Sequence, residues 1–520
     1  MMSGRTAIVI LLLLIVPLTG QGHAEVYTVY NIDEFRSALA RAASNNENDT
    51  IRVASRHYTV ISPLIYYNEN NIGSLKIVAQ NPADLPMFDG AAASGRIMVL
   101  SNNDQYDQSD SGADIMVENL DFRHSSHGGL TITTDAANIK LTNCIFSYNH
   151  DNYHPNGAGG AYLWSRTGSI VVEKSTFHSN RTNTGNGGGL YARTESGTAR
   201  ITKNHFSGNW ALYGGGVDLD TDTGSLELTD NTFKANTANS MEERILSLGG
   251  AVACSASPQG TCRITGNLII GNQATRNGGG GSGGGIFISG ATEVTLENNY
   301  IADNSAIRGG GIYSYLSPSN RTWELTNNTL WRNHATGPYG GGAHIASDSD
   351  DATITITNNI IRDNSSSGGN IGDDLRIDTD PDGNNTASTV NLNYNLLGPH
   401  SDFASGHSED LYITNTDNYH HNGNGTDDPR LRDDGHLPSG SPAINRGICG
   451  TWYYNWRTHK IEYRRIAPLT DRDGDPRPGD RALGGCDIGA DEYHFPWPMF
   501  LPAIIRPHLN PFSIPTHPSF

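Results

Sequence analysis

The feature that most constrains this chain is a phrase that returns every 27 to 36 residues. Each copy holds an apolar residue, two spacers, an Asn, a variable loop, a run of glycines and another apolar residue, as in "YIADNSAIRGGGIY" from Tyr300 to Tyr313. The Asn recurs at Asn149, Asn180, Asn209, Asn236, Asn272, Asn304, Asn333 and Asn364. A period in this range indicates a solenoid, in which each repeat packs on its neighbours.

Short alternating segments lie upstream of these phrases. Segments such as "SIVVEKS" and "TITITNN" place Val, Ile or Thr at alternate positions, which indicates strands. Each unit offers about three strands, one after the glycines and one on either side of a polar pair. The sequence therefore predicts an all-β fold, a right-handed parallel β-helix with an N-terminal helical cap and a C-terminal capping or anchor module.

The repeated Asn and Gly residues have a structural explanation. Equivalent residues of successive coils stack at roughly 4.8 Å. Glycine accepts positive φ at a sharp corner, and Asn tolerates the same region while its amide bonds to the coils above and below. We therefore predict a hydrogen-bonded Asn ladder; a ligand-binding array of these Asn side chains is the alternative. The apolar residue three positions earlier is expected inside the core: Phe146, Phe177, Phe206, Phe233, Ile269, Ile301, Leu330 and Ile361.

Composition narrows the possible partners. The chain has 520 residues, 60 of them Gly, and a formal net charge of −19. The glycine content suits a turn-rich β protein. The negative charge argues against binding to nucleic acid or to anionic membrane surfaces and is compatible with cation binding. We expect a monomer.

Residues 1–24 have the pattern of a secretory signal peptide. Arg5 precedes an apolar stretch from Ala7 to Val16, and a small residue, Ala24, stands at the expected cleavage site. An uncleaved membrane anchor is the alternative, but the apolar run is short for a span. We predict a secreted or cell-surface protein with no transmembrane span after signal removal.

The five cysteines fit an exported protein, because disulfides persist outside the cytosol. Cys254 and Cys262 bracket one turn, and Cys449 and Cys486 flank a C-terminal module. Each pair is a candidate disulfide, although connectivity does not follow from sequence alone. Cys144 is left over and is expected to be buried.

The chain divides into further segments after the signal. Residues 25–113 are expected to form an N-terminal cap and irregular coils, with a helix from about Ile32 to Ala43 and Asn31 as its N-cap. The repeats and a polar loop occupy residues 114–427. A C-terminal module spans residues 428–493, and residues 494–520 form a Pro-rich extended tail.

The C-terminal module carries three motifs in order, "SPAINRG", "DRDGDPRP" and "CDIGADEY". Together they resemble the choice-of-anchor Q module of secreted bacterial repeat proteins, and "FLPAII" in the tail resembles short C-terminal sorting signals. The resemblance covers about residues 114–493. It implies an exported or cell-surface β-helix whose architectural relatives include pectate lyases, polygalacturonases and adhesins. Fold alone does not decide among these functions.

One acidic row stands out in the coils. Asp218, Asp220 and Asp222 alternate in "VDLDTDTG", so they share one face of a strand. A pectate-type lyase needs carboxylates that hold Ca²⁺ together with a basic residue. No basic residue lies close in the same unit, which favours a solvent-facing row; Arg193 and Arg200 in the preceding coil and Arg308 further on are possible bases.

Two segments have the first half of a calcium loop, in which alternate oxygen ligands precede a glycine turn. Their candidate ligands are Asp378, Asp380, Asp382 and Asn384 in the first, and Asp471, Asp473 and Asp475 in the second. Both lack the closing acidic residue, so simple Asp-Gly turns are slightly favoured over calcium sites.

Aromatic residues in the variable loops are candidate glycan contacts: Tyr153, Trp210, Tyr213 and Tyr339. Insertions in a solenoid collect on one face, which is often the binding face. Shielding of the coil below is the alternative role. The sequence thus predicts an exported β-helix that binds glycan or mediates adhesion without catalysis. The alternative is an enzyme of the β-helix superfamily, a Ca²⁺-dependent polysaccharide lyase or a glycoside hydrolase.

Overall fold

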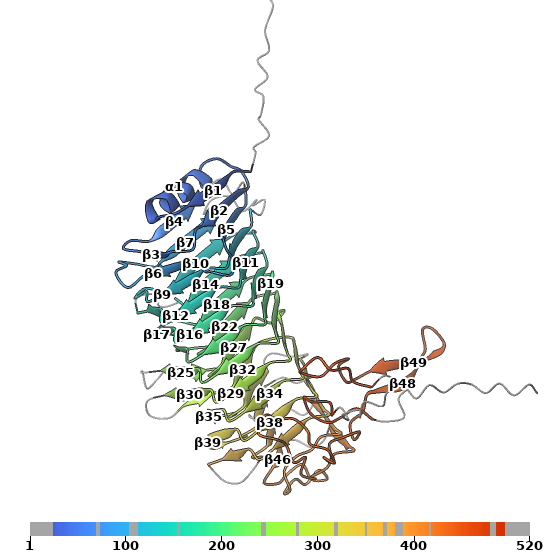
Figure 1. Ribbon diagram of the computed structural model, residues 1–520. Coiled ribbons are helices and arrows are strands. Elements are labelled where there is room, and N and C mark those ends of the chain that lie inside the picture. Colours follow the sequence, from blue (N-terminus) through green and yellow to red (C-terminus); the bar gives the residue numbers. More distant parts are fainter. Residues whose placement is uncertain are drawn as a thin grey trace, which may run out of the picture.

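The computed structural model describes residues 24–68, 73–102, 113–152, 157–240, 246–276, 280–316, 321–348, 351–367, 372–379, 388–414, 418–478 and 485–493. Over these residues the chain winds into a long parallel β-solenoid (Figure 1). One coil runs through β14 (Ala161–Ser165), β15 (Ile170–Glu173), β16 (Thr176–His178) and β17 (Arg181–Thr182). Each strand pairs in parallel with its equivalent in the next coil. The predicted β-helix is confirmed.

Equivalent strands of successive coils stack into four parallel sheets. Sheet A contains β1 (Val26–Val29), β2 (Asp49–Val53), β5 (Leu75–Ala79), β8 (Ile115–Glu118), β11 (Ile139–Thr142), β15, β19 (Thr198–Thr202), β23 (Ser225–Thr229), β28 (Thr261–Thr265), β33 (Glu293–Glu297), β37 (Thr322–Thr326), β41 (Thr353–Thr357), β45 (Thr389–Asn393) and β47 (Tyr419–Asn422). Sheet B contains β3 (His57–Thr59), β6 (Met87–Asp89), β9 (Asp121–Arg123), β12 (Ile145–Ser147), β16, β20 (His205–Ser207), β24 (Thr232–Lys234), β29 (Leu268–Ile270), β34 (Tyr300–Ala302), β38 (Thr329–Trp331) and β42 (Ile360–Arg362).

The other two sheets flank the glycine runs. Sheet C contains β4 (Leu64–Tyr67), β7 (Met98–Asn102), β10 (Leu130–Thr134), β14, β18 (Leu190–Thr194), β22 (Val217–Thr221), β27 (Val252–Ala256), β32 (Ile286–Ser289), β36 (Ile312–Leu316), β40 (Ala343–Ser347), β44 (Leu375–Asp378) and β46 (Leu411–Ile413). Sheet D contains β13 (His150–Asp151), β17, β21 (Trp210–Ala211), β25 (Thr237–Ser240), β26 (Ser247–Leu248), β30 (Gln273–Arg276), β31 (Gly281–Ser282), β35 (Ser305–Arg308), β39 (His334–Tyr339) and β43 (Ser365–Ser366).

Sheet D is the main departure from the three strands expected per unit. Except for β26 and β31, its strands begin directly after the ladder Asn, as Trp210 follows Asn209. The backbone nitrogen of Trp210 donates to the carbonyl of Asn180 in the preceding coil at 2.9 Å. Because the ladder holds this corner in register, the next residues also pair between coils, although they lack an alternating apolar pattern.

The interior contains the predicted stack of apolar residues. Phe88, Phe122, Phe146, Phe177, Phe206 and Phe233 are fully buried, and successive rings stack with centroids 4.7 to 5.6 Å apart. The ladder Asn residues are also buried. In Asn209 the side-chain nitrogen donates to Oδ1 of Asn236 and to the carbonyl of Phe177, both at 2.9 Å, while its Oδ1 accepts from Asn180. The same pattern connects the eight predicted Asn residues from Asn149 to Asn364.

The backbone at this corner differs from expectation in one detail. Positive φ falls on the residue before each ladder Asn, for example φ 55° at Asp363 and 62° at Gly208. The ladder Asn itself keeps negative φ, because its side chain must point inward to reach its neighbours. The first glycine of most runs does take positive φ, as Gly309 does at 59°. A Cβ on the next residue, Gly310, would lie 2.6 Å from the carbonyl oxygen of Gly341, so a side chain is excluded there.

The N-terminal end of the solenoid carries helix α1 (Ile32–Ala42), seen at the top of Figure 1. Oδ1 of the predicted N-cap Asn31 accepts the backbone N–H of Glu34 at 2.9 Å. Phe35 and Leu39 bury the apolar face of the helix against the first coils. The signal peptide predicted for residues 1–24 lies almost wholly outside the described residues. Among those described, no helix is long and apolar enough to cross a membrane.

The C-terminal module packs against the side of the last coils (Figure 1). The side-chain nitrogens of Asn298, Asn327 and Asn358 donate to carbonyl oxygens of the module at Thr470, Asp487 and Ile448. These three Asn residues have positive φ at the corner between sheets A and B, so their side chains face outward. The Pro-rich tail predicted for residues 494–520 lies outside the described residues.

Both predicted cysteine pairs, Cys254–Cys262 and Cys449–Cys486, lie at disulfide distance, and Cys144 is free and buried. The second pair stands at the base of an antiparallel hairpin, β48 (Gly450–Asn455) and β49 (Lys460–Arg465). This hairpin extends away from the coils (Figure 1).

Candidate functional site

The strongest concentration of functional side chains lies on the outward face of sheet C, which we call the C face. Alternation along each strand turns the second and fourth residues outward while the first and third pack in the core. In register from coil to coil, the first outward row is Tyr162, Tyr191, Asp218, Ala253, Phe287, Tyr313, His344, Arg376 and Tyr412. The second row is Trp164, Arg193, Asp220, Ser255, Ser289, Tyr315, Ala346 and Asp378.

The position of the glycine run in each coil determines which residues belong to these two rows. In most coils the residue two positions after the last glycine is the first outward residue, as in Gly189–Leu190–Tyr191 and Gly311–Ile312–Tyr313. The sequence contained this signal, and the aromatic row was nevertheless missed. Of the two rows, sequence reasoning singled out only Asp218 and Asp220, together with Arg193 as a possible base.

The predicted acidic row belongs to the C face. Tyr191 of the preceding coil donates its hydroxyl to Oδ2 of Asp220 at 2.7 Å. Nη2 of Arg193 lies 3.3 Å from Oδ1 of Asp222, which stands just beyond the end of β22. The row is therefore paired with a tyrosine and an arginine of the neighbouring coil. Of the possible bases, Arg193 reaches the row, whereas Arg200 pairs with Glu227 on sheet A.

Burial changes the acidity of this group. Asp218 is only 3% exposed, and burial together with the neighbouring charge of Asp220 raises its pKa well above 3.8. Burial also raises the pKa of Asp220, against the opposing effects of the Tyr191 hydroxyl and the Arg193 guanidinium. The pair therefore retains a proton to higher pH than isolated carboxyls do, since two adjacent carboxylates repel. A neutral carboxyl beside a carboxylate can donate and accept hydrogen bonds.

A second cluster occupies the C face further along the solenoid. Nε2 of His344 lies 2.9 Å from Oδ2 of Asp378, and Nε of Arg376 contacts the same oxygen at 2.9 Å. The ring of Tyr339 stacks on His344 with centroids 5.6 Å apart, and Tyr313 meets the same imidazole edge-on at 5.1 Å. Burial lowers the pKa of His344, against the opposing bond to Asp378.

The predicted loop aromatics divide between the C face and other positions. Tyr339 ends β39 of sheet D and stacks on His344 of the C face, with the guanidinium of Arg308 4.8 Å from its ring centroid. Tyr213 packs against a separate cluster that includes Ala253, Phe287 and Tyr313. Trp210 lies on sheet D under the guanidinium of Arg181, at 4.2 Å. Tyr153 lies outside the described residues.

The first candidate calcium loop is only partly described. Asp378 is engaged by His344 and Arg376, as given above, while Asp380, Asp382 and Asn384 lie outside the described residues. In the second candidate loop, Asp471 accepts backbone N–H groups from Asp473, Asp475 and Glu492. This is the bonding of an Asp-Gly turn, and it uses both oxygens of Asp471.

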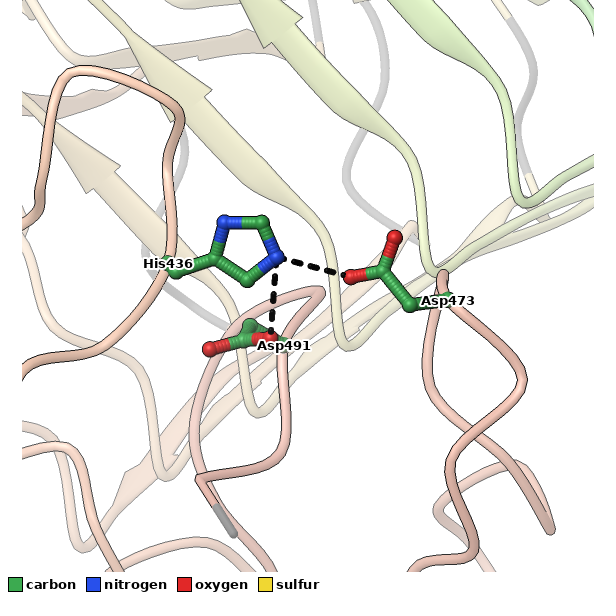
Figure 2. Close-up of side chains that lie close together, drawn as sticks. All are labelled: His436, Asp473 and Asp491. Atoms are coloured by element: carbon green, nitrogen blue, oxygen red, sulfur yellow. Dashed lines mark hydrogen bonds and ion pairs between the residues drawn. The ribbon is translucent and has the colours of Figure 1, made fainter. Parts of the chain in front are cut away.

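Asp473 instead turns toward His436 and Asp491 (Figure 2). Nε2 of His436 lies 3.0 Å from Oδ2 of Asp473 and 3.9 Å from Oδ1 of Asp491, and one ligand atom from each residue lies within 4.8 Å of the others. These residue types bind transition metals. Sequence reasoning missed His436 because it stands 37 residues before Asp473, in a segment without a period.

A positive charge already adjoins that cluster. Nη2 of Arg472 lies 3.0 Å from Nδ1 and 3.2 Å from Nε2 of His436. Nδ1 also lies 3.0 Å from Oδ1 of Asp434. The guanidinium thus offsets part of the negative charge of the carboxylates and would repel a divalent cation. These contacts form an ionic network that joins three loops of the module.

Comparison with known proteins supports the fold at the level of the family. A family model described as a right-handed β-helix region matches residues 105–282 and 266–417, which together cover more than half of the chain. No curated protein matches the sequence. The matched region includes most of the C face and the whole Asn ladder, and it confirms the handedness predicted from the repeat. The chain belongs to the family of right-handed β-helix proteins.

Proposed function

We propose that this chain is an exported β-helix protein that binds a glycan along the C face. The observation that carries the proposal is the row of rings in register on sheet C, interrupted by the buried Asp218 and the half-buried Asp220. Tyr162 is half-buried, whereas Tyr191, Phe287 and Tyr313 are 5 to 8% exposed. Tyr162 and Tyr191 lie on one side of Asp218, with ring centroids 5.3 Å apart, and Phe287 and Tyr313 lie on the other, 5.9 Å apart. Aromatic rings beside hydrogen-bonding groups are characteristic of carbohydrate sites.

The charges of the C face favour a neutral or cationic glycan. Asp218, Asp220 and Asp222 lie together, and the whole chain has a formal net charge of −19. A polyuronate laid over these carboxylates would be repelled unless a cation bridged the two. A neutral sugar instead offers hydroxyl groups to the half-buried Asp220 and a ring face to the half-buried Tyr162.

The predicted signal peptide and the anchor-type module support the part of the proposal that concerns location. The signal pattern in residues 1–24 and the resemblance of residues 428–493 to an anchor module support a location outside the cytosol, where polysaccharides are accessible. Fractionation of the expressing cells tests this part. Recovery of the chain only from the cytosol would contradict it.

A glycan array probed with the purified chain tests the binding function. We expect binding to neutral or amino-sugar polysaccharides and weaker binding to pectin and alginate, in buffer with chelator. If the chain binds none of the polysaccharides on the array, the proposal is contradicted. Substitution of Tyr191 by Phe supplies a matched variant, because it removes only the hydroxyl that orients Asp220.

A second candidate function is hydrolysis or elimination at the same face. The observation that favours it is the Asp218–Asp220 pair, because two carboxyl groups with raised pKa values can supply a general acid and a general base. Assays of new reducing ends and of unsaturated uronate products, with Ca²⁺ and with chelator, separate the two reactions. Product formation that Asp220→Asn abolishes would establish an enzyme. If none of the glycans that bind is converted to product, binding without catalysis remains the function.

A further inference from the structure

The projecting hairpin of β48 and β49 has two different faces. In an antiparallel pair, residues directly opposite each other share a face. Trp452 lies opposite Tyr463, and Tyr454 lies opposite Ile461. The other face holds Thr451, Tyr453, Asn455, Lys460, Glu462 and Arg464. One face is therefore aromatic and aliphatic, and the other is polar.

The apolar face is open to solvent. Trp452 is 60% exposed and Ile461 69% exposed, and Trp456 in the turn is 79% exposed. An isolated hairpin is marginally stable in water, and a contiguous exposed apolar patch normally marks a site of interaction. The side chains do support one another, since Tyr454 and Trp456 make an edge contact with centroids 4.7 Å apart.

The base of the hairpin is held firmly. The Cys449–Cys486 disulfide adjoins β48. At the end of β49, Arg465 donates to the carbonyls of Ala467, Pro468 and Pro478 at 2.8 to 3.1 Å. The hairpin is thus a projection that is anchored at its base and extends away from the coils (Figure 1).

The charge of the hairpin is opposite to that of the chain. It carries Arg457, Lys460, Arg464 and Arg465 against the single acid Glu462, a formal charge of +3 in a chain of −19. At physiological ionic strength charges are screened beyond about 8 Å. A surface that meets the projecting hairpin therefore encounters a local positive charge. The negative net charge of the whole chain, which argues against binding to anionic membranes, does not apply to this hairpin.

We propose that the apolar face of this hairpin inserts into the interface of an anionic lipid bilayer. Trp and Tyr are the residues that membrane interfaces favour, and flanking Arg and Lys are attracted to anionic headgroups. A sugar platform fits less well, because the Trp452–Tyr463 and Tyr454–Trp456 rings are inclined at 60° and 77° and do not form a flat surface. Exposed Ile461 on the same face is aliphatic and suits acyl chains.

Cosedimentation of the purified chain with phosphatidylcholine vesicles, with and without phosphatidylglycerol, tests this proposal. We expect binding to the phosphatidylglycerol vesicles that weakens with salt. Tyr454→Ala and Trp456→Ala should each lower the partition coefficient at least about tenfold, the effect of losing one buried aromatic side chain. Tyr453→Ala is the matched control, because Tyr453 adjoins Tyr454 and is equally exposed (42% against 43%) but lies on the polar face.

Three results would overturn the proposal. The first is no binding of the unchanged chain to anionic vesicles. The second is an equal loss in the Tyr453 and Tyr454 variants, which would reflect damage to the hairpin and not the loss of one face. The third is self-association or binding to an acidic polysaccharide, abolished by Trp456→Ala, in the absence of vesicle binding. Since the hairpin is distant in sequence from the C face, failure here leaves the glycan proposal standing.

Discussion

The hydroxyl of Tyr191 donates a hydrogen bond of 2.7 Å to Asp220 of the next coil, across neighbouring strands of sheet C. This bond joins an aromatic member of the C face to its acidic row and fixes the orientation of both. It holds Asp220 beside Asp218 on the same strand, so the two carboxyls influence each other's ionisation. The C face is thus a connected surface, in which rings, carboxyls and the Arg193 guanidinium are positioned by the coil register.

The buried carboxyl of Asp218 makes stability depend on pH. Its pKa in the folded chain is raised above 3.8, so the folded state holds a proton that the unfolded chain releases. The contribution of this group is therefore most favourable below about pH 4 and is lost as pH rises toward the folded pKa. We expect Asp218→Asn to be more stable than the unchanged chain at neutral pH by roughly 1 to 3 kcal/mol.

Calorimetry at about pH 4 and pH 8 checks this expectation, because the difference between the two proteins should shrink at the lower pH. Asp222→Asn is the control, since Asp222 lies at the exposed end of the same row. A pH-independent difference for the Asp218 variant would contradict the account.

The Asn ladder should be costly to interrupt. Asn209→Ala removes four buried hydrogen bonds and leaves the partners in the coils above and below without them. We expect a loss of about 3 kcal/mol in the free energy of unfolding, measured by urea denaturation. Asn422→Ala, at an exposed position in β47, should change stability by less than about 0.5 kcal/mol. Similar losses at both positions would mean that the ladder does not stabilise the coils.

Arg477 should hold the C-terminal module on the solenoid. Its buried guanidinium donates to Oε2 of Glu492 at 2.7 Å and to Oδ1 of Asn298, 179 residues away, at 3.2 Å. Burial raises the pKa of Glu492 to about 7 even with this partner. Arg477→Met leaves that acid buried and unpaired, at a cost of about 3 to 5 kcal/mol.

Limited proteolysis followed by mass spectrometry measures the effect, and we expect early cleavage within residues 428–493. Arg446→Met is a suitable comparison, because Arg446 forms only an exposed ion pair with Asp427 at 4.0 Å. An unchanged digestion pattern in the Arg477 variant would show that other contacts hold the module.

The ionic network around His436 leads to a prediction about metals. Because the Arg472 guanidinium pairs with Asp473 and places a positive charge beside the candidate ligands, we expect little Zn²⁺ binding there in the unchanged chain. Arg472→Met removes that charge while keeping the three candidate ligands, and should strengthen Zn²⁺ binding by at least about tenfold in calorimetric titrations. The double variant Arg472→Met, His436→Ala should lose the gain. Tight Zn²⁺ binding before any substitution would show that a metal occupies the site despite the arginine.

The repeat made the solenoid predictable, because one period determines the strands, the buried rings and the ladder together. It also contained a second Asn column that was overlooked: Asn204, Asn231, Asn267, Asn299, Asn328, Asn359, Asn395 and Asn424. Its side chains bond from coil to coil as in the first ladder, for example Asn204 to Asn231 at 3.1 Å. The residue before each of these Asn residues has positive φ, as Lys203 and Asp230 do, which repeats the backbone geometry of the first ladder.

The candidate sites were less predictable for a different reason. Alternation showed that Asp218 and Asp220 share a face, but only the register between coils places Tyr191 and Arg193 against them. The His436 cluster depends on loops of a module that has no repeat, so neither spacing nor period brings its members together.

The most direct test of the glycan-binding C face is calorimetric titration of the preferred array glycan into Tyr162→Ala and Tyr148→Ala. Tyr162 lies on the C face, whereas Tyr148 is an exposed tyrosine at the corner between sheets B and D. The account predicts at least about tenfold weaker binding for the Tyr162 variant and unchanged binding for the Tyr148 variant. Equal affinities in both variants, or a loss confined to Tyr148→Ala, would contradict it.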